Sequence, residues 1–80
     1  MNRTIYIRLL EEGSWAYRPV TACRINENIY KVEGHEIHFT DDEVWEFTPG
    51  TIVVVEEKKL RGGIVLVAVR AFNLLNIYNM

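Results

Sequence analysis

Turn residues divide this chain into short apolar segments, spaced at roughly the 8 to 12 residues that separate the strands of small all-β domains. The clearest breaks are Glu12-Gly13-Ser14, Asn26-Glu27-Asn28, Pro49-Gly50 and Gly62-Gly63. Isoleucine and valine outnumber alanine and leucine by 17 to 10. Side chains branched at Cβ favour strands because their χ1 angles are already restricted. The chain is therefore expected to be all-β.

Alternation of apolar and polar residues locates the strands between these breaks. In residues 43–47, alternation places Trp45 and Phe47 on one face, where both are expected to be core residues. Residues 34–42 are the least regular segment, and a loop is expected there. The expected strands are residues 4–10, 15–25, 29–32, 43–47, 51–57 and 64–69.

The second half of the chain predicts a turn followed by a hairpin. Proline fixes the first central φ of a turn and glycine accepts a positive second one, so Pro49-Gly50 is a strong turn signal. The hairpin arms, residues 51–57 and 64–69, are apolar at nearly every position and are joined through residues 58–63. Strands of this kind are buried on both faces or covered by another element.

The length of the chain limits how these strands can be arranged. Eighty residues form one domain, and closing so small a sheet into a barrel leaves the fewest exposed edges. We expect a small antiparallel SH3-like barrel of about five strands, with a sandwich as the alternative. The core is expected over about residues 4–70, and the uncharged tail, residues 71–80, as a short C-terminal helix or an extra strand.

Charge and cysteine content restrict the partners and the compartment. With 9 basic and 11 acidic residues the net charge is -2, so the broad basic surface of non-specific nucleic-acid binders is missing. The single cysteine, Cys23, cannot form an internal disulfide, and no secretory signal pattern opens the chain. The uncharged tail is shorter than the roughly 20 residues of a membrane span. A cytoplasmic location without membrane contact is expected.

The residues capable of catalysis or metal binding form no recognisable motif. Cys23 lies in an expected strand, where a free cysteine usually acts as a small apolar side chain. His35 and His38 could join an acidic residue in a weak metal site, but the remaining ligands of a zinc site are absent. Gly62-Gly63 lacks the spacing and the lysine of a phosphate-binding loop. No enzymatic activity, cofactor or metal is expected.

Nucleic-acid binding is the alternative function. It would require exposed aromatic side chains interleaved with basic ones on a strand face. The acidic residues between positions 41 and 57 oppose it, and the same aromatics could instead pack in the core. The best set is Trp15, Tyr17 and Tyr30 with Arg18, Arg24 and Lys31.

Charge and large aromatics occur together in residues 17–20 and 43–50. A carboxylate such as Glu46 could hold Arg18, and the guanidinium could stack on Trp45. Such a cluster would either fix the register of the strands or form part of a binding site. The sequence leaves both interpretations open.

Four blocks of the sequence also carry a resemblance. They are RLLEEG at 8–13, RPVTA at 18–22, DEVWEFTPG at 42–50 and GIVLVA at 63–68. In this order they resemble a group of small, uncharacterised bacterial proteins built on the pattern RLLxEG, RPVxA, DEVWEFxPG and GxxLVA. No activity is established for that group, so the resemblance implies no catalytic residues.

These observations favour a small protein-binding or regulatory module, because so small a barrel offers edges and loops rather than an interior pocket. One form of this function is an inhibitor whose acidic segment masks a basic site on its partner. A homodimer is also expected, since the tail would otherwise expose apolar residues to water. Trp45 is a candidate contact only if it is not fully buried. The candidate partner-binding residues are Trp15, Tyr17, Arg18, Asp41, Asp42, Glu43, Trp45, Phe72, Leu75 and Tyr78.

Overall fold

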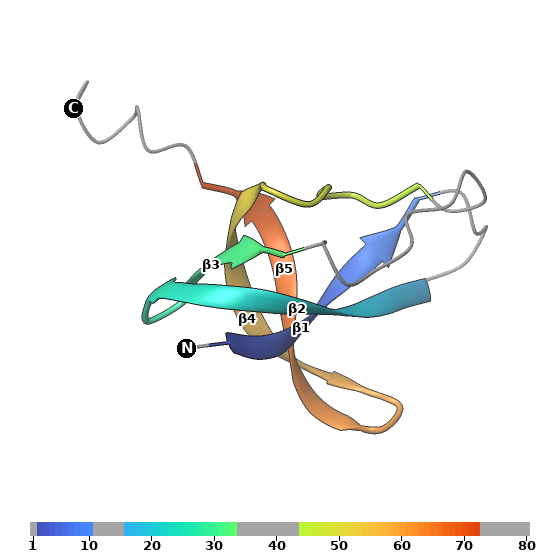
Figure 1. The fold of residues 1–80 in the computed structure, drawn as a ribbon. Helices are drawn as coiled ribbons and strands as arrows, with labels where there is room; N and C mark the ends of the chain where they lie inside the picture. The colour runs from blue at the N-terminus through green and yellow to red at the C-terminus, as the bar shows by residue number, and fades with distance from the viewer. Residues whose placement is uncertain (1, 11–15, 34–43, 73–80) are drawn as a thin grey trace.

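Five strands form a closed barrel in the computed structural model, which describes residues 2–10, 16–33 and 44–72 (Figure 1). Each strand pairs antiparallel with the next, and β1 closes the ring by pairing in parallel with β5. The strands are β1 (Asn2–Leu9), β2 (Ala16–Asn26), β3 (Ile29–Val32), β4 (Ile52–Leu60) and β5 (Gly63–Ala71). The prediction of an all-β barrel of about five strands is confirmed.

The predictions for the tail and for the kind of barrel are not confirmed in the same way. The helix or extra strand expected in the tail falls mostly outside the described residues, although Ala71 itself still belongs to β5 and pairs with Val53. The barrel therefore includes residue 71, the first residue of the expected tail. The SH3-like kind of barrel stays a prediction. None of the described residues forms a helix that could cross a lipid bilayer.

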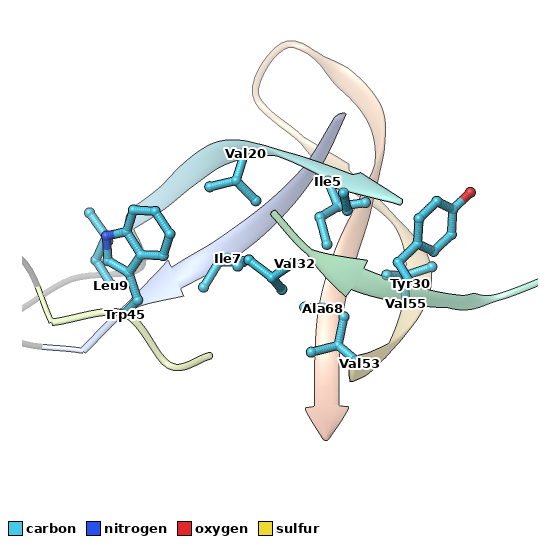
Figure 2. Close-up of a cluster of buried hydrophobic side chains, with 11 residues drawn as sticks. Ile5, Ile7, Leu9, Val20, Tyr30, Val32, Trp45, Val53, Val55 and Ala68 are labelled. Carbon is cyan, nitrogen blue, oxygen red and sulfur yellow. The ribbon is translucent and has the colours of Figure 1, made fainter. Parts of the chain in front are cut away.

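Alternation along β1 places one row of side chains in the core. Ile5, Ile7 and Leu9 are buried, and the residues between them face outward. In Figure 2, Trp45 lies beside Leu9 at one end of the cluster and Tyr30 at the other, with the Tyr30 hydroxyl pointing away from the cluster. The core cluster consists of Ile5, Ile7, Leu9, Val20, Ala22, Tyr30, Val32, Trp45, Val53, Val55 and Ala68.

The predicted turn at Pro49-Gly50 is confirmed. The Thr51 N–H donates to the Thr48 carbonyl at 3.1 Å, and Gly50 has a φ of 93°. A positive φ at the second central position is the geometry of a type II turn. A Cβ at Gly50 would meet nothing within 4 Å, so the backbone angle alone requires glycine there.

The hairpin of β4 and β5 is longer than predicted. Its strands are joined by Arg61 and Gly62 only, so the expected six-residue connection is wrong. Lys58 and Lys59, expected in the connection, both pair with β5. Exposed lysines fit a strand here because the hairpin extends away from the rest of the barrel (Figure 1).

The side chains of β4 change from buried to exposed at the point where the hairpin leaves the barrel. Val53, Val54 and Val55 are all buried, and a register shift lies between Val54 and Val55. Val53 and Val55 join the core cluster, whereas Val54 does not. Residues 56–59 are exposed, so burial on both faces, expected for the whole arm, holds only for the three valines.

The segment around Trp45 is shorter than the predicted strand over residues 43–47. Of its described residues, 44–47, only Trp45 forms a bridge, with Leu9 of β1. The Leu10 N–H donates to the Val44 carbonyl at 2.7 Å, and the Glu46 N–H donates to the Arg8 carbonyl at 2.9 Å. Trp45 is 4% exposed and lies in the core, as predicted. Phe47, expected beside it, is only partly buried against the cluster.

Candidate binding groove

The outer surface of the barrel is hollowed where β1 meets β5. Within the described residues these two strands pair at one position, Tyr6 with Val67. Continuing that parallel register would place Arg3 opposite Ile64 and Thr4 opposite Val65. These four residues instead line a hollow of about 390 Å³, together with Tyr6, Glu57 and Leu66. The strands therefore separate toward the N-terminus of β1, and the gap between them is open.

A second hollow shares lining residues with this gap, and a third shares a residue with the second. One, of about 600 Å³, is lined by Tyr6, Tyr17, Leu60, Arg61, Gly62 and Val65. The other, of about 190 Å³, is lined by Arg8, Tyr17, Glu46, Lys58, Val67, Ala68 and Val69. Tyr6 and Val65 belong to the first and second hollows, and Tyr17 to the second and third. We call the three together the seam groove.

Strand geometry places the aromatic residues of the seam groove. Tyr6 and Arg8 lie on the outward face of β1 because they alternate with the buried residues of that strand. Tyr17 of β2 pairs with Arg8, and directly opposite residues of antiparallel strands share a face. Tyr6, Arg8 and Tyr17 are each only partly exposed. They form a continuous wall across β1 and β2.

The lining of the seam groove is more basic than the chain as a whole. Its charged residues are Arg3, Arg8, Lys58, Arg61, Glu46 and Glu57, four basic against two acidic. The whole chain has a net charge of -2. Ile64, at the entrance of the gap, is 72% exposed. The groove is therefore suited to a ligand that combines negative charge with apolar groups.

Three of the predicted site residues lie in three different environments. Tyr17 lines the seam groove, whereas Trp45 is buried in the core and cannot serve as a surface contact. Arg18 lies on β2 opposite Ile7 and is exposed. Glu46, the carboxylate suggested for Arg18, lines the groove beside Arg8.

Among the other predicted residues, Phe72 and Tyr30 are described, and neither lines the groove. Phe72 is partly buried, and its N–H donates to the Ile52 carbonyl at 2.7 Å. Tyr30 is 1% exposed, so it cannot stack on a base as the nucleic-acid alternative requires. Trp15, His35, His38, Asp41, Asp42, Glu43, Leu75 and Tyr78 lie outside the described residues.

Sequence reasoning missed most of the groove. Alternation already indicated that Tyr6 and Arg8 face outward, but nothing local shows that β5 lies beside them. The sequence pattern predicts a loop at Lys58 and Arg61 and a buried arm at Val65. The missing information is the pairing of two strands at opposite ends of the chain, which no turn signal encodes.

The described residues contain no group of three or more His, Cys, Asp or Glu side chains that could hold a metal ion. No family model matches the chain, and no curated protein or solved structure matches it either. The resemblance of the four sequence blocks to a bacterial group thus stays a prediction.

Proposed function

We propose that this protein is a small, non-enzymatic β-barrel that binds another protein through the seam groove. The observation that carries the proposal is the separation of β1 from β5 beside their single pair, Tyr6 with Val67. It supplies an open surface with two tyrosines, exposed Ile64 and several basic side chains. Tyrosine and arginine are enriched among the residues that dominate the energetics of protein interfaces.

Two charged surfaces define the partner in this proposal. The basic lining of the seam groove favours an acidic segment of the partner. The run Asp41, Asp42 and Glu43 would in turn mask a basic site, which is how an inhibitor of a larger protein would act. With these two contacts the protein would act as a regulatory module rather than as an enzyme. A reducing compartment, the cytoplasm, fits its single free cysteine, Cys23.

Self-association through the tail is part of the same proposal. The tail carries no charged side chain, and its large apolar residues would otherwise face water. A second copy placed around a two-fold axis would cover them. The apolar residues of the tail beyond Phe72 are Leu74, Leu75, Ile77, Tyr78 and Met80.

Nucleic acid is the second candidate ligand, because basic side chains and tyrosines line the same groove. Two observations rank it below a protein partner. The net charge of -2 reduces the attraction for phosphates. The strand edges beside the gap offer alternating backbone donors and acceptors, which match a peptide rather than a phosphate chain.

Affinity capture from the native cell extract tests the proposal. Wild-type protein, Val65→Asp in the seam groove and Ile25→Asp outside it serve as baits, since Ile25 is 51% exposed on β2. We expect the same protein to be captured by the wild type and by Ile25→Asp, and lost with Val65→Asp. Capture of nucleic acid instead of protein, or equal capture by all three baits, would overturn the proposal.

A further inference from the structure

We propose that the seam groove takes an extended acidic segment of the partner protein as an added β-strand, in the gap between β1 and β5. This inference rests on the proposed function and names the way in which the partner binds. Adding a strand to an exposed sheet edge is a common mode of peptide recognition, in which backbone hydrogen bonds supply affinity and side-chain hollows supply specificity.

The direction of the backbone groups of β1 determines which residues an added strand could bond to. Leu10 N–H and Arg8 carbonyl bond to the segment around Trp45, across the edge that faces away from β2. Tyr6 pairs with Pro19, which has no N–H, and this fits a pair that exchanges no hydrogen bonds. Backbone groups alternate along a strand. Thr4, which lines the gap and is in phase with these residues, therefore directs its N–H and carbonyl groups into it.

The barrel itself already fills the other half of the same edge of β1. Toward the C-terminus of β1, residues 44–46 lie against Arg8 and Leu10 through two backbone hydrogen bonds. Trp45 of that segment enters the core. Toward the N-terminus of β1, no described segment occupies the corresponding position. One half of the edge thus carries an added strand from the chain itself, and the other half is open to one from a partner.

The charged and apolar side chains around the gap define the chemistry of the segment that would occupy it. Arg3 and Glu57 line the gap, and Arg61 lines the adjoining second hollow, so the two hollows together carry two basic side chains and one acidic one. Exposed Ile64 and partly exposed Val65 are on opposite faces of β5, so apolar surface is present on both sides of an inserted strand. Charge complementarity therefore favours a segment that combines acidic and apolar residues.

The experiment uses the full chain and three labelled peptides of about ten residues, the upper range of strand lengths. The first alternates glutamate and valine, the second has alternate backbone nitrogens of that peptide methylated, and the third replaces glutamate by lysine. A single-stranded oligonucleotide is the fourth probe. Fluorescence anisotropy at increasing salt measures the affinity of each.

We expect the acidic peptide to bind, and to bind more weakly as salt screens the charges. Methylation should weaken it at least about tenfold, because each lost backbone hydrogen bond contributes a factor of roughly 2 to 12. The lysine peptide should not bind. Equal affinity for the methylated peptide, an affinity of the acidic peptide weaker than about 1 mM, or preference for the oligonucleotide would overturn strand addition.

Variants at Thr4 give an independent test on the protein side. Thr4→Pro removes the N–H that faces the gap while leaving the pairing with β2 intact, and Thr4→Val is the matched control that keeps it. Thr4→Pro should weaken the acidic peptide by a similar factor, and Thr4→Val should not. If Thr4→Pro fails to fold, the methylated peptide decides alone. Native partner capture that Val65→Asp abolishes but folded Thr4→Pro leaves unchanged would refute strand addition and leave the proposed function standing.

Discussion

Replacing Trp45 by alanine should remove a large part of the stability of this barrel. Trp45 is 4% exposed, so nearly all of its side chain is out of water. A tryptophan buries up to about 250 Å², which at about 25 cal/mol per Å² gives an upper bound of about 6 kcal/mol. Alanine retains part of this contact, and large aromatic residues replaced by alanine lose about 3 to 5 kcal/mol. We expect a loss of about 3 to 4 kcal/mol in the free energy of unfolding.

This loss is large for a chain of 80 residues, whose total stability is of the order of 4 to 12 kcal/mol. Urea denaturation followed by far-ultraviolet circular dichroism measures it without depending on the fluorescence of the removed residue. Val44→Ala is the matched control, because Val44 is the neighbouring residue and is 37% exposed. It should change stability by less than about 0.5 kcal/mol. A loss below about 1 kcal/mol for Trp45→Ala would show that the core does not depend on this side chain.

Two further predictions follow from the turns and the tail. Gly50→Ala should cost about 1 to 2 kcal/mol because of the positive φ, whereas Gly62→Ala, which has neither a positive φ nor a neighbour within 4 Å, should stay within about 0.5 kcal/mol of the wild type; equal effects in chemical denaturation would contradict the turn assignment. Sedimentation equilibrium should give a dimer for the full chain and a monomer after truncation behind Phe72, which keeps the Ala71 pair and the Phe72 hydrogen bond. A full-length monomer at high micromolar concentration would refute the tail-mediated dimer.

Local patterns predicted the elements of this fold well, because each depends on neighbours in sequence. Alternation located β1, glycine and proline located the turn at Pro49-Gly50, and β3 begins and ends at the expected residues, Ile29 and Val32. The prediction was wrong for the charged residues of the hairpin, because their tertiary context exposes a strand to water. Lys58 and Lys59 lie in a strand because their part of the hairpin leaves the barrel and both its faces reach water.

The seam groove was much less predictable than the strands. Four of the ten candidate residues are among those that the structure describes, and of these Tyr17 lines the seam groove, while Trp45 belongs to the core. The groove depends on how β1 and β5 approach each other, and that geometry follows from the twist and closure of the whole sheet. No short stretch of sequence contains this information.

The parallel pair that closes the ring has a consequence for the order of folding. Tyr6 and Val67 are 61 positions apart in the chain, whereas β2 meets β3, and β4 meets β5, through connections of two residues. Joining distant segments costs more chain entropy and slows folding. We therefore expect the hairpins to form early and the contact between β1 and β5 to form last. Amide protons on that boundary should exchange with solvent faster than those between β1 and β2, so the ring opens first at the place where a partner would enter.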